Sequence, residues 1–323
     1  MNFKRLLALA VSAGLLAWLM ADGRWRGLGD VFARLDALTL GLSAAGFALS
    51  YGLRALRVFD EFRAQAGRRF GTCLRIVLIH NAMINVVPFR GGEAAFPLLL
   101  RQNFGIPLPR AIASLFWFRL QDAFVVMALA AIVWPGVHPG LKAIAVIGVI
   151  VTAWWLPRWA RAPHDWADGK AFTAKLAKVR DAFAESTRHA RYGWVWTIAN
   201  WTVKLAAQAC LLAALIPAAL AVGAAGALGA ELAAILPIQG VAGFGTYEAG
   251  AAAALLPSGI PLAVGLQVAL ALHLFVIACS VTSGAIAWLF PAARVQETTD
   301  HASSDIQSAS SAVDGAQTRS TAE

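Results

Sequence analysis

Long apolar runs recur along this chain, and each is roughly 17 to 25 residues long. A helix of that length crosses the ~30 Å hydrocarbon interior of a bilayer. Hydrophobic residues form 59% of the sequence and charged residues only 14%. A soluble domain, by contrast, carries about 25% charged residues. The runs therefore predict an all-α polytopic membrane protein with about six full spans.

Basic residues lie mainly between the apolar runs, and they give the chain a net charge of +9. Cytoplasmic loops of membrane proteins carry such an excess of Lys and Arg, so we expect no nucleic-acid partner. We predict a multi-pass protein of a bacterial-type inner (plasma) membrane with a cytoplasmic N-terminus. A cytoplasmic segment is expected after Leu53, where Asp60 and Glu61 are outnumbered by Arg54, Arg57, Arg63, Arg68, Arg69 and Arg75.

The pattern of runs predicts an integral membrane domain at 1–290 followed by a polar tail at 291–323. The tail is rich in Ser, Thr, Ala and acidic residues, and we expect it to be disordered. The first run resembles a signal peptide, but no small-residue cleavage motif follows it, so we expect it to remain as a membrane helix. The expected full spans cover 6–20, 38–53, 111–134, 141–156, 193–217 and 261–290.

The longest polar region within the membrane domain covers 158–192 and is rich in basic residues. Phe172, Leu176, Val179 and Phe183 recur there at helical spacing. This pattern predicts a cytoplasmic amphipathic helix that lies on the membrane surface. An ordinary solvated connector helix is the alternative.

A polar break at 85–93 separates two short apolar runs at 74–87 and 94–100. Charges and unwound backbone at membrane depth occur only where they are buried in protein or line a polar cavity. We therefore predict a re-entrant or broken helix hairpin that carries a functional site. The helix-breaking and charged residues of this break are Pro88, Arg90, Gly91, Gly92 and Glu93.

A second break at 237–248 separates the apolar run at 218–236 from a short run at 249–256. Like the first break, it places glycines before a short helix and a glutamate near the start of that helix. Counting the spans puts the two broken hairpins on opposite faces of the membrane. That is the pattern of an inverted repeat whose halves meet near the midplane. The residues concerned are Pro237, Gly243, Gly245 and Glu248.

The start of a half-helix exposes free backbone N–H groups and the positive end of the helix dipole, which together bind anions. Glycine lets the backbone approach a ligand closely, and the planar guanidinium of Arg90 suits phosphate. We therefore expect a phosphate-bearing head group at the breaks. In the alternative interpretation, Arg90 and Glu93 only pair with each other or with a neighbour to hold the break together.

Further charged residues lie inside predicted spans. Arg119 and Asp122 are one helical turn apart and could pair locally. Lys204 lies near the middle of its span without a local acid, so it needs a partner from another helix or a wet cavity. Glu93 and Glu248 are the candidate partners, and Glu231 and His273 are weaker candidates for functional roles.

Motifs for nucleotide or metal chemistry do not occur in the sequence. No Gly-Lys-Ser/Thr phosphate loop is present, and no strand–helix–strand pattern surrounds the glycines near Gly243. The cysteines show no metal-ligand spacing. We therefore expect no cofactor, no metal, no enzymatic activity and no ATP-driven pumping. Transport would be passive or coupled to an ion gradient.

On these residues the chain resembles the membrane domain of the lysylphosphatidylglycerol synthase family, a flippase-like domain that also occurs as a stand-alone protein. The resemblance extends over most of the chain up to about Phe290. The matching motifs are Arg54-Ala-Leu-Arg57, Asn85-x-x-Pro88-x-Arg90-x-Gly92-Glu93, Arg119-x-x-Asp122, and Pro237 followed by Gly243-x-Gly245-x-x-Glu248.

The resemblance implies translocation of phospholipids or related polar lipids between leaflets. Some stand-alone relatives are associated with isoprenoid lipid pathways and others with glycosyltransferases. The chain departs from the family where Phe96 replaces a frequent basic residue, Phe118 a frequent acid and His273 a frequent Arg. The soluble aminoacyl-transferase domain is missing, so synthesis of a lysyl-lipid is not expected.

The leading functional prediction is flipping of a polar lipid with an anionic or aminoacylated phosphate head group, with membrane lipids as the partners. The rival predictions are an ion-coupled small-solute transporter and a non-catalytic scaffold for a lipid-modifying or glycosyltransferase enzyme. The oligomeric state is left open. The predicted substrate-binding residues are Arg90, Gly91, Gly92, Glu93, Arg119, Asp122, Lys204, Gly243, Gly245 and Glu248.

Overall fold

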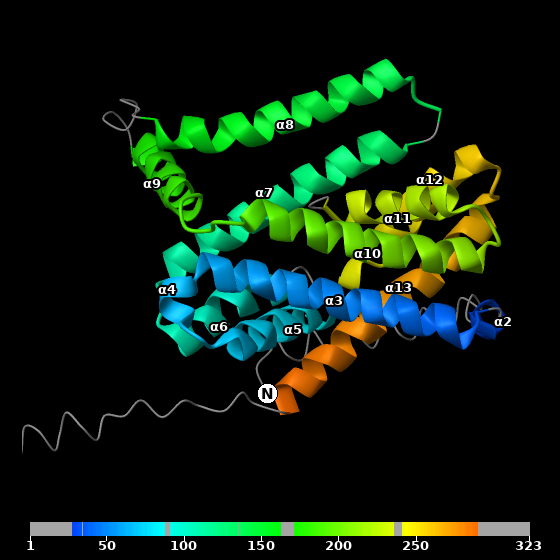
Figure 1. Cartoon of the computed structure of the whole chain (residues 1–323), viewed down its shortest axis with the longest axis horizontal. Helices are drawn as coiled ribbons and strands as arrows, with labels where there is room; N and C mark the ends of the chain where they lie inside the picture. Colours follow the sequence, from blue (N-terminus) through cyan, green and yellow to red (C-terminus); the bar gives the residue numbers. More distant parts are fainter. Residues whose placement is uncertain are drawn as a thin grey trace, which may run out of the picture. The chain divides into compact units, whose positions relative to one another are not determined.

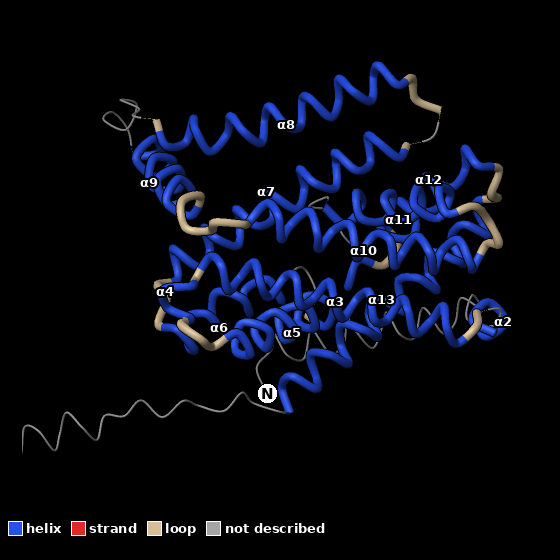
Figure 2. Tube along the Cα trace, in the orientation of Figure 1, coloured by secondary structure: helices blue, strands red, loops and turns tan. Residues whose placement is uncertain are grey.

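The computed structural model describes residues 28–33, 35–87, 91–134, 136–162, 171–235 and 241–289. Within these ranges the chain forms helices joined by short loops and no strand, which confirms the all-α prediction (Figure 1, Figure 2). The predicted first span at 6–20 and the predicted disordered tail at 291–323 lie outside the described residues.

The described helices include two, α2 and α4, that match no predicted apolar run. In chain order, the described helices are α2 (Leu28–Ala33), α3 (Ala37–Glu61), α4 (Arg63–Ala66), α5 (Phe70–Val86), η2 (Gly91–Ala94), α6 (Ala95–Phe104), α7 (Leu108–Val133), α8 (Pro139–Arg161), α9 (Ala171–Ser186), α10 (Gly193–Leu215), α11 (Leu220–Ile235), η4 (Val241–Gly243), α12 (Thr246–Leu255), η5 (Leu256–Ser258) and α13 (Leu262–Leu289).

Four helices among the described residues, α7, α8, α10 and α13, are long and apolar enough to cross a membrane. They correspond to the predicted runs at 111–134, 141–156, 193–217 and 261–290. Helix α3 has 25 residues, but charged side chains in its second half lower its hydropathy. A chain with several such helices is a multi-pass membrane protein, as predicted.

The end of α3 corrects the sequence prediction, which closed this span at Leu53 and placed Arg54 and Arg57 in a cytoplasmic segment. The helix instead continues to Glu61. Arg57 is only 2% exposed, because its guanidinium pairs with a carboxylate on α7. A charged residue with a buried partner need not end a helix. The prediction used charge alone and therefore ended this helix too early.

The start of α3 is set by a side-chain cap. Asp36 Oδ1 accepts a hydrogen bond from the backbone N–H of Thr39 at 2.7 Å, which satisfies one of the free N–H groups of the first turn. The Thr39 hydroxyl also donates to Asp36 Oδ2 at 2.9 Å, and the two hydrogen bonds from Thr39 lower the pKa of the Asp36 carboxyl. The cap explains why the helix begins at Ala37, directly before the apolar run.

Three long side-by-side pairings organise the bundle: α3 with α10, α11 with α12, and α5 with α13 (Figure 1). One apolar core lies among α10 to α13 and contains Leu212, Leu255 and Leu272. A second lies among α3, α5, α6 and α7 and contains Phe62 and Leu100. The two breaks, η2 and η4, both follow helices of this bundle, so the packing brings them into it.

Helices α11 and α12 cross at very close range because glycines meet at the contact. A Cβ added to Gly250 would lie 2.5 Å from Ala233 Cβ and would overlap the carbonyl oxygen of Gly229. A Cβ added to Gly229 would lie 2.5 Å from Ala254 Cβ. Small residues at such crossings let membrane helices approach closely and gain van der Waals contact.

Gly250→Val should therefore destabilise the protein by about 1 to 3 kcal/mol, because the side chain forces α11 and α12 apart. The midpoint of thermal unfolding in detergent measures the effect. Gly148→Val is the matched control, since no atom lies within 4 Å of a Cβ at this position on α8. Equal losses in both variants would show that the crossing is not the cause.

The predicted hairpins correspond to α5 with α6 and to α11 with α12, each interrupted by a short 3₁₀ segment. In both cases the two helices pack against each other. The helices after the breaks, α6 and α12, have 10 residues each, too few to cross a bilayer alone. Their re-entrant course and the inverted repeat remain predictions.

Helices α8 and α9 lie at the side of α7 that faces away from α3 and α5 (Figure 1). The outward side chains of α8 are large and apolar, for example Ile147 and Trp154. In the predicted amphipathic helix, now α9, Phe183 is buried against Trp117 of α7, with ring centroids 5.4 Å apart. At least this part of its apolar face is therefore covered by protein, not by the membrane surface.

Candidate functional site

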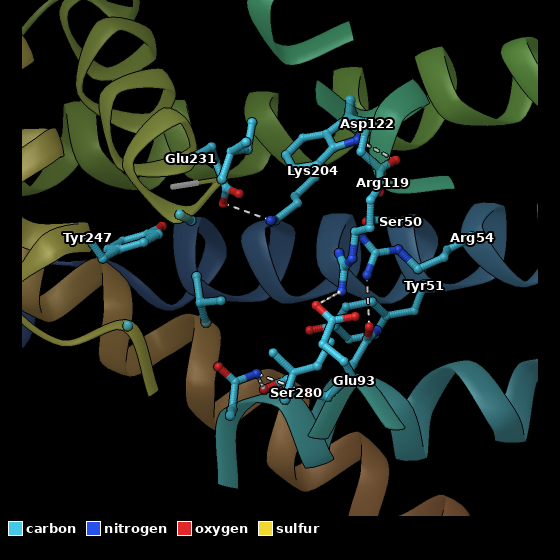
Figure 3. A pocket seen from close by; sticks show the side chains of 18 of the residues that line it. Ser50, Tyr51, Arg54, Glu93, Arg119, Asp122, Lys204, Glu231, Tyr247 and Ser280 are labelled. Atoms are coloured by element: carbon cyan, nitrogen blue, oxygen red, sulfur yellow. Dashed lines mark hydrogen bonds and ion pairs between the residues drawn. The ribbon is translucent and has the colours of Figure 1, made fainter. Parts of the chain in front are cut away.

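A cavity of about 550 Å³ lies among the helices, and both breaks contribute to its wall. Glu93 comes from η2, and Ala242 with Gly243 comes from η4. Figure 3 shows charged and polar side chains pointing into this space from several helices. Its charged lining residues are Arg54, Glu93, Arg119, Asp122, Lys204 and Glu231, and its polar ones include Ser50, Tyr51, Asn81, Asn85, Tyr247, His273 and Ser280.

The first break places Glu93 at the cavity through a tightly packed glycine. Gly92 is buried, and a Cβ at this position would overlap the carbonyl group of Met83 on α5. A Cβ at Gly91 would lie 2.8 Å from Val87 Cγ1. The glycines thus let η2 fold back onto α5. Pro88 and Arg90 lie outside the described residues, so the role of Arg90 in binding a phosphate head group stays a prediction.

Arg119 and Asp122 do not pair with each other, contrary to the local pairing considered from the sequence. Arg119 Nη2 lies 2.8 Å from Glu93 Oε1. Asp122 Oδ1 lies 2.6 Å from Arg57 Nη1 and accepts a hydrogen bond from Trp201 Nε1 at 2.9 Å. Residues one turn apart can pair along a helix, but here each side chain finds a partner on a different element.

Lys204 pairs with Glu231 of α11, with 2.7 Å between Nζ and Oε1. Its expected partners, Glu93 and Glu248, are both engaged elsewhere, so this prediction was wrong. Gln208 Nε2 donates to Glu231 Oε1 at 2.7 Å and to the Tyr247 hydroxyl at 3.0 Å. The lysine therefore belongs to a hydrogen-bonded chain that links α10, α11 and α12 (Figure 3).

The second break is held by Glu248. Its Oε2 accepts the backbone N–H of Gly245 at 2.7 Å, and its Oε1 lies 2.6 Å from His273 Nδ1. Gly243 and Gly245 have φ angles of +83° and +86°, a region that glycine adopts without steric cost. Glu248 is consequently a cap of α12 that lies behind the cavity wall, while Gly243 and His273 line it.

Arg54 is a cavity residue that sequence reasoning missed. Its Nη1 donates to Asn81 Oδ1 at 2.8 Å. Phe47, Ser50 and Tyr51 line the cavity with it, and their spacing of i, i+3, i+4 and i+7 places all of them on one face of α3. This periodicity was available in the sequence and would have shown that the arginine continues an inward-facing stripe.

The predicted substrate-binding residues therefore divide into three groups. The cavity is lined by Glu93, Arg119, Asp122, Lys204 and Gly243. Gly91, Gly92, Gly245 and Glu248 shape the two breaks without lining it. Arg90 lies outside the described residues.

Two departures from the family pattern lie against each other. Phe96 and Phe118, which stand where the resemblance led us to expect a basic residue and an acid, meet edge to face with ring centroids 6.1 Å apart. The Arg57 guanidinium lies 4.1 Å from the centroid of the Phe118 ring. An aromatic contact thus occupies the place where opposite charges were expected.

The described helices and the charged cavity between two helix breaks define a polytopic helical membrane protein with an internal polar site. The chain matches the family described as "Lysylphosphatidylglycerol synthase TM region" over residues 5–284. It belongs to this family of membrane domains, which is associated with lipid-related flippase function. The comparison with curated proteins and the comparison with solved structures found no match.

Proposed function

We propose that this protein moves a polar lipid with an anionic or aminoacylated phosphate head group from one leaflet of the inner membrane to the other. The head group passes through the charged cavity, and the acyl or isoprenoid tails remain in the bilayer. We also propose that the N-terminus lies in the cytoplasm. The proposal involves movement and no covalent chemistry, so neither a cofactor nor a metal enters it.

The observation that carries the proposal is the combination of buried charges and exposed apolar side chains around one cavity. Phe116 of α7 lines the cavity and is 53% exposed, and Ile235 of α11 lines it and is 37% exposed. Arg119 lies one turn beyond Phe116 on the same face of α7. A lipid can therefore place its head group beside Arg119 while its tails contact Phe116 and the bilayer.

The energetic reason is the cost of moving a charged head group through hydrocarbon. An isolated charge in an apolar medium is strongly unfavourable unless paired or hydrogen-bonded. Ser50, Tyr51 and Asn85 supply polar groups along the cavity wall, and the ion pairs supply fixed charges. These groups replace part of the head group's hydration during the crossing.

Ala123→Trp should slow lipid exchange at least tenfold, because Ala123 lines the cavity and an indole there blocks the path, a barrier increase of about 1.4 kcal/mol or more. The assay measures the rate at which head-group-labelled lipid moves between the leaflets of vesicles that contain the purified protein. Ala145→Trp on the exposed face of α8 is the matched control and should retain the wild-type rate.

Folded wild-type protein that accelerates no lipid would contradict the proposal. In that case uptake of a water-soluble compound by the same vesicles would support the small-solute transporter. The scaffold would instead be supported if neutralising Lys175, Lys178 and Arg180 abolished the protein's function in cells while substitutions in the cavity left that function unchanged.

A further inference from the structure

His273 of α13 forms a dyad with Glu248 at the second break. Its Nδ1 lies 2.6 Å from Glu248 Oε1, and the other carboxylate oxygen accepts the backbone N–H of Gly245. The two side chains are buried, with exposed fractions of 4% and 8%. Because a carboxylate has no proton to donate, the proton between the two residues lies on Nδ1. Glu248 therefore fixes which nitrogen of the neutral ring carries the proton.

The second ring nitrogen, Nε2, is open to a ligand. His273 lines the cavity, and its Nε2 forms no hydrogen bond with the described residues. A Cβ at Gly243 would lie 3.7 Å from Nε2, so a larger side chain there would cover this nitrogen. The ring packs against Tyr247 and Phe244, with centroids 4.3 Å and 4.7 Å away. These contacts hold the imidazole in place beside the cavity.

Protonation changes what Nε2 can bind. In the neutral ring with its proton on Nδ1, Nε2 accepts a hydrogen bond, and in the imidazolium it donates one. The charged oxygens of a phosphodiester only accept hydrogen bonds. They can therefore bond to Nε2 only while the ring carries its second proton. Imidazole is the side chain that changes charge between about pH 5 and 8.

We propose that His273 couples phosphate binding in this cavity to proton uptake: Nε2 donates to a phosphate oxygen only when the ring is protonated. The inference rests on the proposed function, because it assigns the pH regulation of the same cavity. One proton enters the ring with each phosphate bound and leaves it when the phosphate is released. A pH difference across the membrane then drives the lipid from the more acidic side to the less acidic side.

Other charged or titratable groups approach His273 from the surrounding elements. Glu248 and Tyr247 of α12 contact it directly. A hydrogen-bonded chain leads from Tyr247 to the ion pair of Lys204 and Glu231. Further groups on α2, α3 and α5 are Asp30, Tyr51, Arg54, Cys73, Arg75 and His80. All of these remain when His273 alone is changed, so a pH response that His273 causes must disappear in such a variant.

The first test measures binding of phosphatidylglycerol to the purified full chain in detergent from pH 6 to pH 8.5. This phosphodiester keeps one negative charge over the whole range, so its own titration does not contribute. The affinity of the wild type should fall by about tenfold per pH unit once the free ring is neutral, the dependence that uptake of one proton produces. Calorimetry in two buffers of different ionisation enthalpy should count about one proton taken up per lipid at pH 8.

Two substitutions assign this response to His273. His273→Gln carries no charge at any pH, so its affinity should not change with pH and should be about tenfold below the wild type at pH 6, because a charged donor forms the stronger hydrogen bond. His273→Arg supplies a permanent cation and should bind equally well at pH 6 and pH 8.5. The proton count on the wild type needs no variant, so it tests the inference even if a substitution prevents folding.

His138→Asn is the matched control. His138 is exposed and caps α8 by accepting the backbone N–H of Gly140, a hydrogen bond that Asn can also accept. This variant removes one titrating imidazole far along the chain from the dyad. It should keep the affinity and the pH dependence of the wild type.

Wild-type binding that strengthens as the pH rises would overturn the inference, because the neutral ring would then be accepting from a hydroxyl or ammonium group. So would a proton count of zero, no binding, or a His273→Gln protein with wild-type pH dependence. Water-soluble glycerophosphoglycerol that binds as tightly with the same pH dependence would support the role of His273 and make a free phosphodiester the ligand.

Vesicle exchange separates this inference from the proposed function. Proton-linked binding without lipid exchange would contradict only the proposed function. Lipid exchange by the wild type at a rate that does not change with pH, with no proton taken up on binding, would contradict only the role of His273.

Discussion

Asp122→Ala is expected to lower the free energy of unfolding by about 3 to 5 kcal/mol, the cost of leaving one buried charge without its partner. Asp122 Oδ1 lies 2.6 Å from Arg57 Nη1, and the two side chains are 8% and 3% exposed. The same oxygen accepts the indole N–H of Trp201. The truncation leaves both donors without this acceptor. The unfolding temperature of the purified protein in detergent measures the loss.

Two comparisons isolate this effect. Glu185→Ala is the matched control, because Glu185 also contacts basic side chains but is 56% exposed, and exposed pairs contribute only about 0 to 1 kcal/mol. Arg57→Met combined with Asp122→Leu removes both charges and should recover most of the stability, since apolar replacement of a whole buried pair is often neutral. An Asp122→Ala protein that unfolds at the wild-type temperature would refute the buried pairing.

The second large effect is expected from removing the charges of Lys204 and Glu231 together. Lys204→Met with Glu231→Gln should slow lipid exchange tenfold or more while the fold is retained, a barrier increase of about 1.4 kcal/mol or more. The fold is retained because no buried charge is left unpaired and the introduced amide oxygen can still accept from Gln208. Exchange slows because the cavity wall loses the two charges of this ion pair. Vesicle exchange and thermal unfolding are measured on the same preparation.

The single variants show why both substitutions are needed. Lys204→Met leaves Glu231 buried without its cation, and Glu231→Gln leaves Lys204 without its anion. Each single variant should lose about 3 to 5 kcal/mol of stability. Slow lipid exchange by a single variant would therefore not distinguish misfolding from lost transport. Wild-type exchange by a folded double variant would show that this ion pair only supports the structure.

The interrupted helices were predictable from local sequence. Gly91 and Gly92 before one short helix, and Gly243 and Gly245 before another, identify the breaks because helix propensity and backbone freedom act within a few residues. The placement of Glu93 at the cavity follows from the same motif. The role of Glu248 was less accessible, because a glutamate three residues after Gly245 can cap its own helix or face a ligand, and here it caps.

Arg54 illustrates a different kind of failure. A cluster of arginines after an apolar run indicates a cytoplasmic loop, and that rule was applied to 54–75 as a whole. The first of these arginines belong to α3, where helical periodicity outweighs the charge rule. The helical spacing of Phe47, Ser50 and Tyr51 predicts that Arg54 lies on the same face of one continuous helix.

The sequence by itself determined that this chain is a multi-pass helical membrane protein of its family, with two interrupted helices carrying glycines and a glutamate. Run length and break residues are local properties, so one sequence suffices to read them. Only the tertiary structure decided which charges meet. Arg57 and Asp122 are 65 positions apart and Glu93 and Arg119 are 26 apart, and their pairing depends on how separate helices pack and rotate against one another.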